Sequence, residues 1–273
     1  MNLKNLTLTI CLTLAFLLGS TGTSWGADFN KGHAAYESGD FATALREWRP
    51  LAEQGNASAQ HNLGWMYRKG EGVPQDDKTA VKWYTLTAEQ GTASAQFNLG
   101  WMYANGKGVS QDYKTAVKWY TLAAEQGHAS AQYALGWIYR KGFGLSQDDK
   151  TAVKWYTLAA EQGTATAQFN LGLMYYKGQG VSQDYKTAVK WYTLAAEQGF
   201  ATAQYNLGFM YRKGQGVIKD NVYAHMWGNI SASNGSENGS KLREKVAKTM
   251  TTAQIEKAQD LARECVRKEY KGC

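Results

Sequence analysis

The side chains in this sequence that could do chemistry are few, and their spacing excludes most kinds of enzymatic site. A metal site needs several His, Cys, Asp or Glu ligands at short spacing, and a phosphate-binding glycine loop needs a following Lys-Ser/Thr pair. The glycines of the Gly70–Gly72 type lack that pair, and the sequence contains no nucleophile elbow. The histidines are scattered without ligand spacing: His33, His61, His128 and His225. We therefore expect a protein that is not an enzyme and that holds no metal and no cofactor.

An internal repeat indicates how the remaining residues are positioned. The run Leu63–Tyr67 recurs every 36 residues, as the runs that begin at Leu99, Leu135, Leu171 and Leu207. A period of about 20 to 50 residues is typical of one supersecondary unit stacked on copies of itself, which is a solenoid. Because an active site is a single asymmetric arrangement, we interpret residues that recur along the repeats, such as Asp76 with its four copies and Lys82 with its three, as structural. The repeat favours a binding surface over catalysis.

Each unit predicts two helices. In the unit 56–91, apolar residues recur at helical spacing up to Tyr67, and glycines end this first helix. Asp76 stands where a carboxylate can cap the second helix, which Gly91 closes. Gly64 lies inside the first helix, where glycine costs about 1 kcal/mol relative to alanine. Its recurrence in all five units predicts a close approach of the first helix to its partner helix.

The two ends of the chain differ from the repeats. Lys4, the apolar run Leu6–Leu18 and the small residues before Ala27 have the layout of a secretory signal peptide over residues 1–26. The alternative is an uncleaved membrane anchor, but the run is shorter than the roughly 20 residues of a spanning helix. Residues 27–55 are expected to form an N-terminal capping helix pair. Residues 236–273 are expected to form the C-terminal cap. After a linker over 235–239, helices are expected over 241–250 and 253–268, with Thr252 as the cap of the second helix.

Two cysteines, Cys265 and Cys273, remain once the leader is removed. Thiols eight positions apart in an exported chain suit an intramolecular disulfide, although free or intermolecular thiols are the alternative. The net charge of +7, to which Lys4 contributes one, is not concentrated in a basic cluster. We therefore expect no nucleic-acid binding, no stable membrane insertion after cleavage, and a preference for an acidic partner.

The unit A-x-A-Q-x-x-L-G-x-M-Y-x-x-G-x-G-V-x-x-D-x-x-x-A-x-x-W-Y, which runs from Ala57 to Tyr84 and again from Ala93 and Ala129, resembles the Sel-1-like repeat, a relative of the tetratricopeptide repeat. The resemblance covers 56–235, as the units 56–91, 92–127, 128–163, 164–199 and 200–235. Leu173, Phe209 and the second helix of the last unit, which loses most matches, depart from the pattern. It implies an all-α, right-handed superhelix of helix-turn-helix pairs that serves as an interaction scaffold. It also implies periplasmic or secreted bacterial relatives.

The tetratricopeptide resemblance further implies that one face of the first helix of each unit lines a concave groove. Positions 61, 65 and 68 fall at i, i+4 and i+7 and therefore share a helix face. The candidate partner-binding residues at these positions and their copies are His61, Phe97, Tyr133, Phe169 and Tyr205, then Trp65, Trp101, Trp137 and Phe209, then Arg68, Arg140, Tyr176 and Arg212. The groove is predicted to be aromatic with a basic border, although some rings of the 61 row could simply pack against the neighbouring repeat.

Three functions are compatible with such a groove. Large rings with Arg and Lys at the edge suit a peptide or protein partner in the periplasm or outside the cell, with Trp101 and Trp137 as central anchors. The same rings would also suit stacking on a cell-wall or secreted polysaccharide. Some relatives of the family are described as beta-lactam binding or hydrolysing, but this sequence has no S-x-x-K arrangement and no metal set. We expect the protein to be a scaffold that binds a protein partner.

Overall fold

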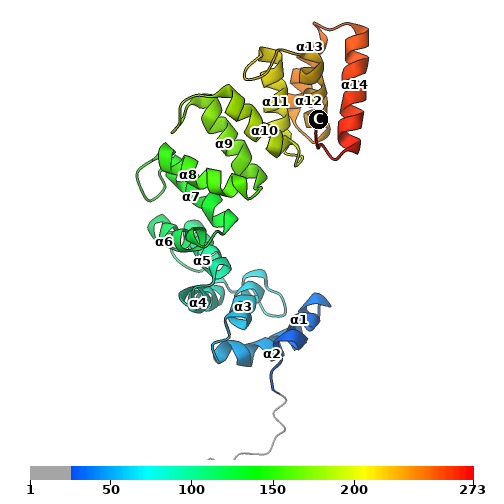
Figure 1. Cartoon of the computed structure of the whole chain (residues 1–273). Coiled ribbons are helices and arrows are strands. Elements are labelled where there is room, and N and C mark those ends of the chain that lie inside the picture. The colour runs from blue at the N-terminus through cyan, green and yellow to red at the C-terminus, as the bar shows by residue number, and fades with distance from the viewer. Residues whose placement is uncertain (1–25) are drawn as a thin grey trace, which may run out of the picture.

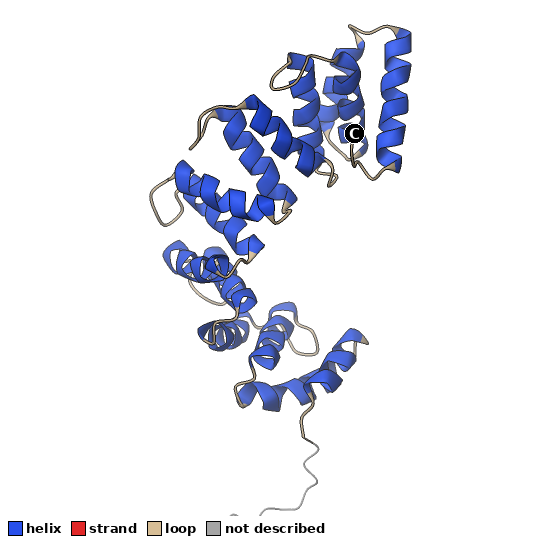
Figure 2. Cartoon of the chain, in the orientation of Figure 1, coloured by secondary structure: helices blue, strands red, loops and turns tan. Residues whose placement is uncertain are grey.

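The computed structural model describes residues 26–273, and these residues fold into helices joined by short loops (Figures 1 and 2). The predicted leader lies outside the described residues, apart from Gly26. Consecutive helices pair along a curved path, so the all-α repeat solenoid is confirmed. In chain order the helices are α1 (Phe29–Glu37), α2 (Phe41–Glu53), α3 (Ala57–Lys69), α4 (Asp77–Glu89), α5 (Ala93–Asn105), α6 (Tyr113–Glu125), α7 (Ala129–Lys141), α8 (Asp149–Glu161), α9 (Ala165–Lys177), α10 (Tyr185–Ala196), α11 (Ala201–Lys213), α12 (Asn221–Ser233), α13 (Glu237–Ala247) and α14 (Thr252–Arg267). Within residues 26–273, no helix combines the length and the apolar character needed to cross a membrane.

Each repeat contains a helix A (α3, α5, α7, α9 or α11) and a helix B (α4, α6, α8, α10 or α12), and recurrent caps set their ends. The Asp76 carboxylate accepts hydrogen bonds from the backbone N–H groups of Lys78 and Thr79 at the start of α4. Copies of Asp76 cap the other four B helices. α3 ends at Gly70, whose φ of 75° is the left-handed conformation that glycine adopts without strain. The capping aspartates and closing glycines are therefore confirmed as structural residues.

The glycine inside helix A lies against an aromatic ring of helix B. A Cβ atom on Gly136 would stand 2.6 Å from the ring of Tyr156, which is fully buried. The equivalent glycines of the first, second and fourth repeats meet the equivalent tyrosines at 2.8 to 2.9 Å. In the last repeat, Gly208 instead faces Trp227 and Leu242. The close approach predicted from the repeated glycine is confirmed, and its partner is the tyrosine ring.

A ladder of buried amides joins each repeat to the one before it. The side chain of Gln96 donates from Nε2 to the carbonyl of Ala88 at the end of α4, at 3.1 Å. Its Oε1 accepts from Nε2 of Gln126, at 2.8 Å, just after α6. The same two bonds recur in the other repeats at Gln60, Gln132, Gln168 and Gln204, with Asn234 as the donor in the last. Because a buried amide without partners is costly, the ladder fixes how successive repeats are stacked.

The C-terminal end differs from its sequence prediction in two places. α13 begins at Glu237, inside the segment predicted as a linker, with Ser236 as its cap. Its Gly239 lies so close to α12 that a Cβ atom would stand 2.7 Å from the backbone nitrogen of Ala232, so the glycine is a packing residue. Thr251 rather than Thr252 caps α14, through a capping box with Gln254.

A disulfide fastens the chain end to the last repeat. Cys265, which is buried in the core that α14 shares with α11 and α12, is bonded to Cys273. Between them, the hydroxyl of Tyr270 donates to Oδ1 of Asn234 at 3.1 Å. The intramolecular bridge expected from the spacing is present in the structure.

Three of the histidines are shielded from water. Burial lowers the pKa of His61 and His128 below the ordinary histidine value, and at His225 burial is reinforced by the charge of Arg243. His128 also caps α7, since its Nδ1 accepts from the backbone N–H of Ala131 at 3.3 Å. The fold therefore favours the neutral form of these rings.

We expect Gly136→Val to lower the free energy of unfolding by about 3 kcal/mol, as overpacking of a tight core does. Helix propensity alone predicts a slight gain, because valine is the better helix former. Urea denaturation of the purified protein measures the change. Ser130→Val, at an exposed position of the same helix, is the control and should change stability by less than about 0.5 kcal/mol. Equal stability of Gly136→Val and the wild type would contradict the close-packing account.

We expect Cys273→Ser to lower the stability of the C-terminal end by about 2.5 kcal/mol, the value that loop entropy gives for so short a loop. Reduction of the wild type should have the same effect, and reduction of the variant should add nothing. Thermal unfolding with and without reductant measures both. Two free thiols in the intact mass of the exported protein would show that the bridge does not form.

Stability should fall as the pH is lowered from 7.5 to 5. Because the folded pKa values of the three histidines lie below their unfolded values, the unfolded state takes up more protons as the pH falls through about 6.5. His128→Asn should reduce this pH dependence while keeping the helix cap, as Asn56 caps α3 by accepting from Ala59 at 2.9 Å. Urea midpoints across this range provide the test, and a slope unchanged in His128→Asn would exclude His128 as a contributor.

Candidate ligand-binding surface

The candidate residues lie on one side of the A helices, which we call the helix-A face: positions 61, 65 and 68 of the first repeat and their copies. The rings of the 61 row are half-buried, and in the first four repeats they pack on the tyrosine of their own helix B. The ring centroids of His61 and Tyr84 are 5.6 Å apart, and those of Phe97 and Tyr120 are 5.7 Å apart. Tyr133 and Phe169 make the equivalent contacts. These rings thus contribute both to the packing within a repeat and to the surface.

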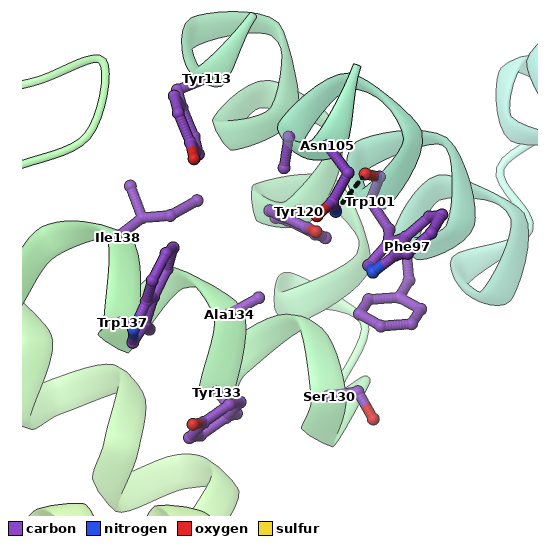
Figure 3. A pocket seen from close by; sticks show the side chains of 11 residues that line it. Phe97, Trp101, Asn105, Tyr113, Tyr120, Ser130, Tyr133, Ala134, Trp137 and Ile138 are labelled. Atoms are coloured by element: carbon purple, nitrogen blue, oxygen red, sulfur yellow. Dashed lines mark hydrogen bonds between the residues drawn. The ribbon is translucent and has the colours of Figure 1, made fainter. Parts of the chain in front are cut away.

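The structure brings four candidate rings together in one cavity between the second and third repeats, which we call the central pocket. Its volume is about 310 Å³. Phe97 and Trp101 from α5 lie on one side, and Tyr133 and Trp137 from α7 lie on the other (Figure 3). Trp137 is 37% exposed, which is high for so large an apolar side chain. The two tryptophans predicted as central anchors therefore face the same space.

Sequence reasoning missed two rings of this pocket, because both belong to helix B. Tyr113, the first residue of α6, and Tyr120 also line the cavity. Tyr113 is held by a stacked contact with Phe143, at 5.0 Å between centroids. The second repeat has Tyr113 where the first has Asp77, and this difference is the sequence signal that could have identified Tyr113 as a surface ring. Six aromatic rings thus surround one pocket.

The rest of the helix-A face is divided into smaller pockets instead of forming one continuous groove. Leu173, Tyr176, Tyr205 and Phe209 surround a cavity of about 140 Å³ between the fourth and fifth repeats. His61 and Trp65 line another, of about 280 Å³, together with Tyr36 of α1. Phe169 is separated from the smaller of these pockets and packs against Phe200 instead, at 5.1 Å between centroids. Most of the predicted residues therefore line separate pockets along the solenoid, and Arg68 lines a further one with Trp101.

Two arginines reach across the junctions between these pockets. The guanidinium of Arg68 lies 4.3 Å from the ring centroid of Trp101, across the junction between the first and second repeats. It also lies 5.3 Å from Trp65, whose ring has Lys69 at 4.9 Å. Arg140 donates to Oδ1 of Asn170 at 2.9 Å, across the junction between the third and fourth repeats. Arg212 occupies the equivalent position of α11 and is half-buried.

The central pocket itself is neutral. Burial raises the pKa of Tyr120 and Tyr133 above the ordinary tyrosine value, so both phenols stay protonated at neutral pH. Its polar margin is Asn105, whose amide is already engaged with the carbonyl of Trp101 at 2.8 Å (Figure 3). In the part of the chain that the structure describes, three or more His, Cys, Asp or Glu side chains do not gather into a potential metal site. The site is suited to holding an apolar group.

Comparisons with known proteins agree with this architecture. A crystal structure of a Sel1 repeat protein from Oxalobacter formigenes is 35% identical to this chain, with a TM-score of 0.74 and coverage of 86% of this chain and 94% of that one. A protective antigen of uropathogenic Escherichia coli with an SLR fold is 29% identical, with a TM-score of 0.38 and coverage of 89% and 69%. The immunity protein Pa5087 from Pseudomonas aeruginosa is 20% identical, with a TM-score of 0.44 and coverage of 79% and 81%. Among curated proteins, none matches the chain.

The family comparison covers most of the helical part of the chain. The model described as the Sel1 repeat matches residues 57–92, 93–128, 129–164, 165–200 and 201–236. Each segment begins one residue after the unit delimited from the sequence and contains one helix A and one helix B. The chain therefore belongs to the Sel1 repeat family.

Proposed function

We propose that this protein is a non-enzymatic scaffold that binds a peptide segment of a protein partner on its helix-A face. The convergence of Phe97, Trp101, Tyr133 and Trp137 on the central pocket supports this proposal most strongly. Buried aromatic anchors at the centre of a surface carry most of the energy of many protein interfaces. A helical repeat scaffold is consistent with such a role, because it presents one extended surface built from many helices.

The arrangement of the cations favours a peptide over a polysaccharide. Stacking on a sugar needs an open ring face, but the guanidinium of Arg68 lies over Trp101 and Trp65. Cations on both sides of the central pocket, with Arg68 and Lys69 on α3 and Arg140 and Lys141 on α7, would complement an acidic partner. The partner is therefore a segment with large apolar side chains and acidic residues.

The compartment we propose is the bacterial periplasm or the exterior of the cell. The disulfide between Cys265 and Cys273 is a bond that persists in oxidising compartments. It agrees with the secretory signal peptide predicted over residues 1–26. In this setting the partner would be an envelope or secreted protein.

We expect the double variant Trp101→Ala/Trp137→Ala to weaken binding of the partner by more than about 1 kcal/mol, with the fold intact. The partner is first captured from the envelope fraction with the wild-type protein, identified by mass spectrometry and purified. Isothermal titration then gives the affinity of each variant.

The matched control is Leu122→Ala/Leu158→Ala, which removes two exposed leucines of α6 and α8 at 44% and 42% exposure. It should leave the affinity unchanged. An affinity that survives loss of both tryptophans but falls in the leucine control would place the binding surface on helix B and overturn the proposal. Binding through the cationic edge should also weaken as the salt concentration rises.

A further inference from the structure

The junctions between successive A helices are built from a recurrent pair of positions. The first is position 68 and its copies, near the end of helix A. The second is position 98 and its copies, in the helix A that follows. The pairs along the chain are Arg68 with Asn98, Ala104 with Ala134, Arg140 with Asn170, and Tyr176 with Asn206. Among these four junctions, only the one between the second and third repeats has alanine at both positions.

The junction that has alanine at both positions is the one that holds the central pocket. At the third-to-fourth junction, Arg140 reaches across to Asn170 at 2.9 Å. At the first-to-second junction, Arg68 reaches across to Trp101. Ala104 and Ala134 cannot span the equivalent space, and both line the cavity of about 310 Å³. Where Tyr176 fills part of the space, the cavity is about 140 Å³. Beside Arg68, at the first-to-second junction, the cavity is about 220 Å³. The side chains at these positions therefore influence the volume left at a junction.

The size and walls of the central pocket define what fits it. An apolar cavity of about 150 Å³ can hold one benzene ring, so about 310 Å³ has room for a one- or two-ring side chain. The walls carry Phe97, Trp101, Tyr113, Tyr120, Tyr133 and Trp137, whose edges and faces suit a further aromatic ring. A charged group would lose its hydration there without a charged partner among the lining residues.

The surroundings of the pocket add a charge requirement. Trp101 also lines a neighbouring cleft with Arg68, Lys69 and Lys107, where Asp77 is the one carboxylate. The excess of cations in this cleft favours a carboxylate on the ligand next to its ring. An aromatic residue flanked by Asp or Glu meets both requirements.

We propose that the central pocket is the specificity pocket of the helix-A face, and that it binds one aromatic side chain flanked by acidic residues in the partner peptide. With alanine at positions 104 and 134 the junction holds about 310 Å³, against about 220 Å³ beside Arg68 and about 140 Å³ beside Tyr176. The inference rests on the proposed function, because it assumes a peptide on this face, and it adds which side chain is selected and where.

Three peptides test the selectivity on the full exported protein. The probes are acetyl-Asp-Phe-Asp-amide, acetyl-Asp-Ala-Asp-amide and acetyl-Lys-Phe-Lys-amide, with dissociation constants measured by ligand-observed NMR. We expect the first peptide to bind at least tenfold more tightly than either of the others. Equal affinity of the Phe and Ala peptides would overturn the aromatic assignment, and equal affinity of the Asp and Lys peptides would overturn the acidic one.

Two double variants test whether the peptide binds in the central pocket. Ala104→Arg/Ala134→Asn restores the side chains of the third-to-fourth junction and should abolish the tenfold preference for phenylalanine. The reverse change, Arg140→Ala/Asn170→Ala, should open a second pocket beside Tyr133, Trp137 and Phe169, and raise the peptide stoichiometry from one to two. The reverse variant adds no bulk, so it tests the account even if the first variant folds poorly. An unchanged preference in the first variant, or an unchanged stoichiometry in the second, would contradict the pocket assignment.

Failure of this inference can be told apart from failure of the proposed function. If capture of the partner depends on Trp101 and Trp137 but is unaffected by Ala104→Arg/Ala134→Asn, the helix-A face is the binding surface and the pocket inference is wrong. If capture depends on neither, the proposed function itself is wrong. Reduced capture in both variants supports both.

Discussion

The contact between a helix A glycine and a helix B tyrosine is the constraint on which the rest of the structure depends. Because a Cβ atom on Gly100 would stand 2.8 Å from the ring of Tyr120, the observed packing of the two helices requires a residue without a side chain at this position. The approach brings the tyrosine ring through to the helix-A face, where it supports Phe97 and lines the central pocket. The same residue thus serves the core and the surface. A repeat that lost the glycine would lose the shape of its binding surface along with its stability.

The residues at a few positions between successive A helices differ from one repeat to the next, so the junctions differ in the space they enclose. The glutamine ladder recurs between successive repeats from Gln60 to Gln204, while the side chains between successive A helices differ. Arginine reaches across two junctions, while alanine at both positions of another leaves room for the central pocket. A repeated scaffold can in this way carry one unrepeated site.

The sequence predicted the repeating part of the structure well, because that part depends on local signals. The period, the capping aspartates and the closing glycines specify the ends of the helices, and the costly Gly64 and its copies indicate the close helix packing. The pairing of Cys265 with Cys273 followed from a short spacing. In contrast, the start of α13 was missed because Gly239 resembles a linker residue, whereas its lack of a side chain lets α13 pack on α12.

The binding surface was predicted only in outline. Helical spacing placed positions 61, 65 and 68 on one face. Whether rings of neighbouring repeats meet depends on the rotation between repeats, and the spacing within one helix gives no information about that rotation. Ala104 and Ala134 have no polar or aromatic side chain that would mark a site in the sequence. Their importance lies in the space between them, which only the structure shows. Tyr113 enters the pocket from helix B, on which no binding residue was sought.

Site-specific photo-crosslinking in the producing cell tests the central claim most directly, because it asks which face meets a partner under native conditions. A benzophenone side chain would replace Asn105, at the mouth of the central pocket, and in a second strain Leu122, an exposed residue of helix B. The account predicts a discrete crosslinked protein from position 105 and none from position 122. A crosslink to a protein from position 122 alone would contradict it.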